Sequence, residues 1–169
     1  MDDRRLLPLL EDALRAERDG YEFYTMAAEK SEDVGAVKVF EHLAEEERRH
    51  FGALQMEYRA ILDGSGWDPS VVLGERWRPQ GASGIFSEDF RRRIEGRHLE
   101  MSALSIGILL EKSAHVFYAD AAEAEKDEAV RRFFGDLADW ENEHYQLLLR
   151  EDSDLRDEYW SESRFAPLS

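Results

Sequence analysis

The chain has 169 residues, 43% of them hydrophobic, which is the size and composition of one folded domain with its own core. A formal net charge of −16 argues against binding to nucleic acid or to anionic membranes, because both need basic protein surfaces. The absence of cysteine excludes disulfides, iron–sulfur clusters, cysteine-ligated zinc and thiol catalysis.

Hydrophobic residues at spacings of three and four predict four helices. The first spans about 3–30, and a turn at 31–35 leads into a second helix that ends near residue 63. The stripes of the third and fourth helices run through 104–122 and 130–148. Between the two pairs, residues 64–85 contain five glycines and two prolines, and they are predicted to form a long crossover.

Shorter features complete the expected layout. Ser87 is predicted to cap a short helix that continues to Ile94. Residues 1–152 are predicted to form the bundle domain, and 153–169 a C-terminal extension that packs on the bundle or on a partner. The N-terminus lacks a basic region followed by a long apolar stretch, and the longest apolar run, 103–110, is too short to span a membrane. A cytoplasmic protein is therefore expected.

The two halves of the chain repeat one another. Residues 17–54 and 111–148 align without a gap at an offset of 94 positions. The matches include hydrophobic and polar residues alike: Phe40, Leu43, Ala44, Glu47, His50 and Leu54 recur as Phe134, Leu137, Ala138, Glu141, His144 and Leu148. The chain is therefore predicted to consist of two copies of one helical hairpin.

Six polar residues fall inside the hydrophobic stripes: Glu17, Glu47, His50, Glu111, Glu141 and His144. Four carboxylates buried together are costly, and two divalent cations would balance their charge. Each Glu-x-x-His pair lies on one helix face, and both hairpins separate their two glutamates by 30 residues, so all six side chains are expected at one height. They are predicted to hold two metal ions. Glu95 and His98 have the same spacing but no copy and no stripe, and they are predicted to be a solvated pair.

One glutamate from each of two helices plus a Glu-x-x-His from each of the other two is the pattern of ferritin-like di-iron carboxylate proteins. With Glu17-x-x-Gly20-x-x-Phe23-Tyr24 and Leu43-Ala44-Glu45-Glu46-Glu47-x-x-His50, the chain resembles the rubrerythrin branch over about residues 6–150. The resemblance implies an all-α, antiparallel four-helix bundle with two iron ions, for which manganese or zinc could substitute. It also implies that Glu47 and Glu141 bridge the metals, that Glu17 and Glu111 are terminal ligands, and that His50 and His144 bind one iron each.

Three features depart from the family pattern. Rubrerythrins usually carry a rubredoxin with four cysteines, which this chain does not contain, so a separate electron-donor protein is expected. The family has an additional glutamate three residues after the third-helix ligand, where this chain has Ala114. Related bacterioferritins have a haem-binding methionine where this chain has Arg48, so no haem is expected.

Three residues near the predicted ligands have two interpretations each. Tyr24 and Tyr118 lie two turns after Glu17 and Glu111 on the same faces, where their hydroxyls either hydrogen-bond the carboxylates across the bundle or simply belong to the core. His115 follows Glu111 by one turn. It is either a further ligand or proton donor, or a polar residue satisfied near the core.

The resemblance implies an oxidoreductase in which two Fe(II) ions reduce hydrogen peroxide or dioxygen, in oxidative-stress defence or iron handling. An iron-storage subunit and a non-catalytic, metal-stabilised interaction module are the alternatives. The long crossover would allow two chains to exchange hairpins, so a homodimer is expected.

Overall fold

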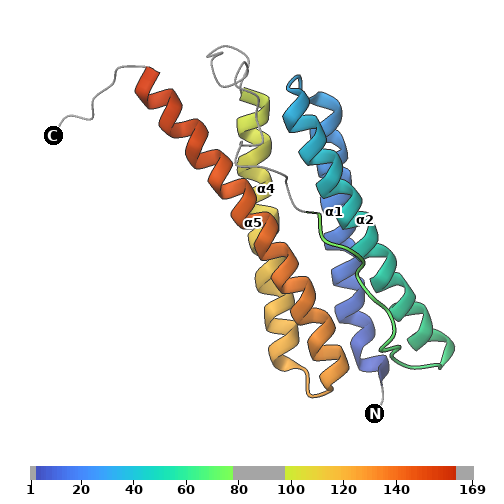
Figure 1. Cartoon of the computed structure of the whole chain (residues 1–169). Helices are drawn as coiled ribbons and strands as arrows, with labels where there is room; N and C mark the ends of the chain where they lie inside the picture. Colours follow the sequence, from blue (N-terminus) through green and yellow to red (C-terminus); the bar gives the residue numbers. More distant parts are fainter. Residues whose placement is uncertain (1–2, 78–97, 163–169) are drawn as a thin grey trace.

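A computed structural model of the chain describes residues 3–77 and 98–162, with side chains to residue 157. Over these residues the chain begins with a 3-10 turn, η1 (Asp3–Leu6), and continues as four helices: α1 (Leu7–Lys30), α2 (Val34–Asp63), α4 (His98–Ala124) and α5 (Glu128–Glu162). The helices pack as two antiparallel hairpins, α1 with α2 and α4 with α5, side by side in one bundle (Figure 1). The predicted four-helix bundle of two hairpins is confirmed.

Both hairpins turn on an aspartate at the same position of the repeat. Asp33 caps α2, because its side chain accepts a hydrogen bond from Ala36 N at 2.9 Å. Asp127 does the same for α5, accepting from Ala129 N at 2.9 Å and from Val130 N at 3.2 Å. Each side chain satisfies helix N–H groups that have no partner within the helix, so the two short turns end and restart a helix at equivalent places.

The hydrophobic core consists of two clusters, one on each side of the bundle's mid-height. The cluster near the N-terminal end of α1 includes Leu10, Leu54, Tyr118, Phe134 and Leu137. The other includes Tyr24, Phe40, Leu43, Leu104 and Leu148. The repeat is visible in the packing, since Tyr24 stacks on Phe40 at 6.2 Å between ring centroids and Tyr118 stacks on Phe134 at 6.1 Å. The buried glutamates and histidines at mid-height therefore lie between two hydrophobic clusters.

The crossover begins at Gly64, whose φ of 90° ends α2 in a conformation that favours glycine. Its described part, to Trp77, runs back along α2 (Figure 1). Three contacts attach it to α2. Asp68 N donates a hydrogen bond to Glu57 at 3.0 Å, and the carbonyl oxygen of Glu75 accepts one from Arg49 at 2.7 Å. The ring of Trp77 stacks on that of His42, with 4.4 Å between centroids. This return path brings residues 75–77 to the middle of the bundle.

The fourth helix continues without a break to Glu162, past residue 152, where the bundle domain was predicted to end. The predicted helix from Ser87 to Ile94, Glu95 and the last residues of the extension lie outside the described residues, whereas His98 is exposed at the start of α4. Within the described chain, no helix combines the length and hydrophobicity needed to cross a membrane.

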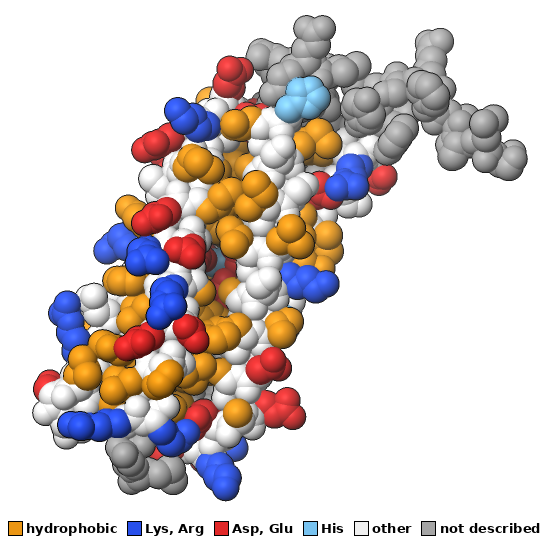
Figure 2. Space-filling view, turned by 180° about the vertical axis from the view of Figure 1, so that it is seen from behind, with side chains coloured by type: hydrophobic (Ala, Val, Ile, Leu, Met, Phe, Trp, Pro, Cys, Tyr) orange, Lys and Arg blue, Asp and Glu red, His pale blue; other side chains and the backbone are white. Residues whose placement is uncertain are grey.

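Helix α4 carries hydrophobic residues on more than its inner face. Ile106, Leu109 and Val116 are exposed, and hydrophobic side chains gather over the side of the bundle formed by α1 and α4 (Figure 2). Most surface helices show a narrower apolar stripe. This side of the bundle is therefore suited to contact with apolar groups.

Glu57 is fully buried where the crossover attaches, and burial is the main reason why its pKa rises to about 7. The unfolded carboxyl ionises near 4.5, so the folded state holds its proton more tightly, and stability falls as pH rises from about 4.5 to about 7. We expect Glu57→Gln to remove this loss and to raise the free energy of unfolding by about 1–3 kcal/mol at pH 8. Urea denaturation at pH 4.5 and pH 8 measures it. Exposed Glu41→Gln on the same helix is the control, and an equal gain at both pH values would contradict the prediction.

Candidate metal centre

All six predicted ligands meet at mid-height, from all four helices. Each is buried, with relative exposures between 0% for His50 and 4% for Glu47 and His144. They form two overlapping groups, in each of which the candidate ligand atoms lie within 4.8 Å of one another: Glu17, Glu47, His50 and Glu141, and Glu47, Glu111, Glu141 and His144. Glu47 and Glu141 belong to both groups, so the geometry suits two cations that share two carboxylates.

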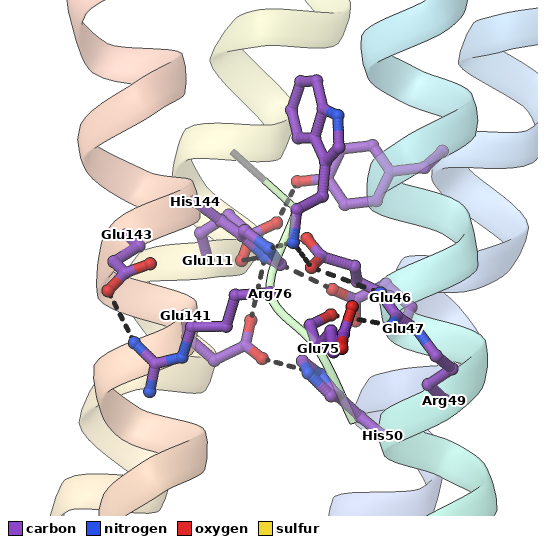
Figure 3. A network of polar contacts seen from close by, with 12 residues as sticks. Glu46, Glu47, Arg49, His50, Glu75, Arg76, Glu111, Glu141, Glu143 and His144 are labelled. Atoms are coloured by element: carbon purple, nitrogen blue, oxygen red, sulfur yellow. Dashed lines mark hydrogen bonds and ion pairs between the residues drawn. The ribbon is translucent and has the colours of Figure 1, made fainter. Parts of the chain in front are cut away.

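Both imidazoles present Nδ1 to the centre (Figure 3). His50 Nδ1 lies 3.2 Å from Glu17 and 3.2 Å from Glu141. His144 Nδ1 lies 3.4 Å from Glu111 and 3.7 Å from Glu47. One nitrogen and carboxylate oxygens around each position are ligands that suit first-row transition metals.

Several atoms of the centre are buried without a hydrogen-bond partner among the described residues. They are Glu47 Oε1, Glu111 Oε2, Glu141 Oε1, His50 Nε2 and His144 Nδ1. Buried polar atoms are almost always paired, because an unpaired one loses its hydration without replacement. All of these atoms except His50 Nε2 lack a partner within the centre, and two cations would supply the missing partners. The donor set therefore fits a two-metal site.

Ionisation of the cluster without metal is unfavourable. Burial, followed by repulsion from the neighbouring carboxylates, raises the pKa of Glu47 and of Glu141 well above the usual range. Burial also acts to raise the pKa of Glu111, but the positive charge of nearby His144 outweighs it and leaves that pKa lowered. Burial lowers the pKa of His144, yet Glu111 and Glu46 raise it to about 10. Protons thus occupy part of the centre when cations do not.

Tyr24 and Tyr118 hold the carboxylates across the bundle. Tyr24 on α1 donates its hydroxyl hydrogen to Glu111 on α4, and Tyr118 on α4 donates to Glu17 on α1. Burial and the adjacent carboxylates raise the pKa of both phenols well above 10, so both remain protonated donors. Of the two interpretations, hydrogen bonding to the predicted ligands is the one observed, and each ring also packs in the core.

Glu46, which the sequence interpretation did not include, supports His144. Its side chain is 1% exposed, and its Oε2 lies 2.7 Å from His144 Nε2 (Figure 3). Its Oε1 accepts from Trp77 N at 2.7 Å. Burial acts to raise the pKa of Glu46, but the hydrogen bond from His144 outweighs it, so the pKa is lowered and Glu46 stays ionised. A carboxylate behind a histidine fixes the ring orientation and makes the facing nitrogen a better ligand.

The repeat places Trp140 where Glu46 stands in the first half. Its ring meets His50 edge-on, with 4.7 Å between centroids and an interplanar angle of 81°. The guanidinium of Arg76 also lies over the indole, 5.0 Å from its centroid. His144 is thus backed by a carboxylate and His50 by an aromatic ring, so the two metal positions are chemically unequal despite the repeat.

His115 does not join the centre. Its Nδ1 lies 2.8 Å from the carbonyl oxygen of Ala138 on α5, which is a hydrogen bond from the ring to the backbone. It is partly buried, and it belongs to neither group of candidate ligands. The interpretation as a polar residue satisfied near the core agrees with this contact, and a role as a further ligand or proton donor stays a prediction.

A protein-family model described as rubrerythrin matches residues 8–151, which is most of the chain. No curated protein and no solved structure matches it.

Proposed function

The chain belongs to the rubrerythrin family, which is a family of ferritin-like di-iron proteins, and from this premise we propose that it is a di-iron oxidoreductase that reduces hydrogen peroxide or dioxygen. The observation that carries the proposal is the pair of overlapping buried ligand groups that share Glu47 and Glu141. Two shared carboxylates would keep two iron ions close enough for one small oxidant to meet both. A separate protein would return the electrons, and the activity would serve oxidative-stress defence or iron handling.

The residues have distinct roles in this proposal. Glu17 and His50 would hold one iron, Glu111 and His144 the other, and Glu47 and Glu141 both. When bound, the two ferrous ions supply the two electrons that the oxidant takes up. Tyr24 and Tyr118 keep Glu111 and Glu17 in position by hydrogen bonds, and the two hydrophobic clusters shield the centre from water along the length of the bundle. Hard, flexible carboxylates suit iron in both oxidation states, although manganese or zinc could enter the same positions.

Anaerobic titration with Fe(II), followed by stopped-flow mixing with hydrogen peroxide or air-saturated buffer, tests the proposal. We expect about two Fe(II) per chain, and oxidation that slows by at least about tenfold in Glu47→Gln, because that substitution removes a ligand to both irons. Glu45→Gln is the matched control, since Glu45 is an exposed neighbour that pairs with Arg48. Binding of fewer than two irons, or equal oxidation rates in the two variants, would refute the assignment.

The same samples separate the alternatives by size. We propose a homodimer, for which the exposed hydrophobic side chains of α4 provide a contact surface. Light scattering coupled to size exclusion would give about twice the chain mass of 19.6 kDa for a dimer. A large closed shell that accumulates many irons per chain would instead support iron storage.

A further inference from the structure

A cavity between α1 and α4 leads from the surface to the metal centre. Its volume is about 240 Å³, and its lining includes all four glutamates of the centre. Seen from the side of α1 and α4, the surface is hollowed at mid-height, with acidic side chains in the hollow and hydrophobic side chains around it (Figure 2). Among the described residues, it is an opening through which a small molecule could reach the ligands without moving a helix.

Small residues create this space. Ala16 and Gly20 of α1 and Ala114 of α4 line the cavity, together with the larger Leu110 and Phe117. Gly20 cannot be replaced freely, because a Cβ there would lie 2.6 Å from Glu47 Oε2. The carboxylate of Glu47 therefore occupies the volume that a side chain at residue 20 would need. Ala114 leaves the facing side of the cavity open.

The cavity is larger than hydrogen peroxide requires. A cavity needs roughly 10–15 Å³ of space open to a water-sized molecule in order to hold one water, so 240 Å³ is many times that requirement. Hydrogen peroxide, with two oxygen atoms, needs about the space of two waters. The remaining space lies against Leu110, Ala114 and Phe117, where an apolar group would lose its contact with water.

The charges around the cavity limit what can enter. Among the described residues that line it there are the four glutamates and Asp19, and there is no lysine, arginine or histidine. Two bound cations would balance the four glutamates, which leaves Asp19 as the unbalanced charge of the described lining, and no cationic side chain there would pair with the charged group of an organic anion. An uncharged molecule with an apolar tail and a reactive polar end suits this cavity. Its tail would contact the apolar lining, and its polar end would face the glutamates.

We propose that this cavity binds the alkyl group of a small, uncharged organic hydroperoxide, with the O–O group directed toward the metal positions. This proposal rests on the proposed function. With two ferrous ions bound, the centre would supply the two electrons, and solvent the two protons, that convert the hydroperoxide into an alcohol and water as its O–O bond breaks. The substrate class of the centre then includes organic hydroperoxides as well as hydrogen peroxide.

Single-turnover oxidation of the Fe(II)-loaded protein by tert-butyl hydroperoxide and by hydrogen peroxide tests this inference. We expect wild-type rate constants for the two oxidants within about tenfold, and a ratio of organic to inorganic rate that falls at least tenfold in Ala114→Leu, which fills the cavity. Ala124→Leu, which makes the same change at an exposed position at the end of the same helix, should leave the ratio unchanged. Ala16→Leu provides a second filled cavity should Ala114→Leu fail to fold.

Binding is measured independently of iron chemistry. Saturation-transfer NMR on the Zn(II)-loaded protein should detect tert-butanol, the product alcohol, and the signal should disappear in the filled variants but persist in Ala124→Leu. Oxidation by hydrogen peroxide without oxidation by tert-butyl hydroperoxide would overturn the inference and leave the proposed function standing. Failure with both oxidants would overturn both. Equal slowing of the two oxidants in the filled variants, or alcohol binding that they do not change, would also overturn the inference.

Discussion

The metal-free protein is expected to lose stability as pH rises above about 5, and two bound divalent cations are expected to restore it. The metal-free centre keeps protons on Glu47 and Glu141, whose pKa values burial raises well above the ordinary 4.5. For a raised pKa, the folded state binds its proton more tightly, so the stabilisation is complete below 4.5 and is lost as pH rises through the folded value.

His144 acts in the same direction at higher pH. Burial lowers its pKa, but the surrounding carboxylates raise it from 6.5 to about 10, so its contribution is lost between those values. Glu111 and Glu46 have lowered pKa values and the opposite sign, but their contributions are complete above about 4.5 and do not change in the alkaline direction. The net slope of stability with pH should therefore be negative from about pH 5 upward.

Cations replace these protons, and they bind the folded chain but not the unfolded chain. At a free concentration 1,000 times its Kd, each cation adds about 4 kcal/mol to the free energy of unfolding. Two cations would then raise Tm by about 15–30 °C for a domain of this size. Thermal and urea denaturation at pH 5, 6.5 and 8, with Zn(II) or with a chelator, measure both effects.

The double variant Glu47→Gln/Glu141→Gln separates the two effects. It should reduce the pH dependence of the metal-free protein, because neutral amides have no proton to lose, while the contributions of Glu57 and His144 remain. Cations should stabilise the double variant much less. Glu45→Gln should behave as wild type, since Glu45 is exposed and paired with Arg48. A metal-free wild type whose stability is constant from pH 5 to pH 8 would contradict the prediction.

The bundle and its six candidate ligands could be predicted from the sequence because both depend on local spacing. Residues three or four apart lie on one helix face whatever surrounds them, and an internal repeat places equivalent residues at equivalent heights. Glu17 and Glu111 are predictable for this reason. The hydroxyls of Tyr24 and Tyr118 were predictable only as one of two alternatives, because which carboxylate each one meets depends on the packing of α1 against α4.

Contacts between helices were harder to predict. Glu46 follows Leu43 by three and precedes His50 by four, so its spacing alone places it in the buried stripe. Its charge, between two other glutamates, makes it resemble a solvated residue. The contact with His144 depends on the rotation of α2 against α5, and the contact with Trp77 on where a loop returns. Neither is a property of local sequence.

Removal of the Glu46 carboxylate is expected to weaken the metal position of His144 selectively. In Glu46→Ala, His144 Nε2 loses its acceptor, so the ring is less well oriented and Nδ1 becomes a weaker ligand. Loss of such a partner typically costs about 10–100-fold in metal affinity. Titration of Glu46→Ala with Co(II) in competition with a chelator should therefore resolve two affinities. One should equal the wild-type value, and the other, at the position of His144, should be about 10–100-fold weaker.

Trp140→Phe is the matched control, because Trp140 is the repeat counterpart that backs His50. The indole packs edge-on and accepts no hydrogen bond from that ring, so a smaller aromatic residue should change affinity by less than about threefold, within the range of a weak aromatic contact. Glu46→Ala also leaves Trp77 N without its acceptor, and hydrogen exchange at residues 75–77 should accelerate. Equal weakening of both metal positions in Glu46→Ala would contradict the prediction. The carboxylate would then stabilise the bundle as a whole rather than orient His144, and it would not explain a difference in affinity between the two positions.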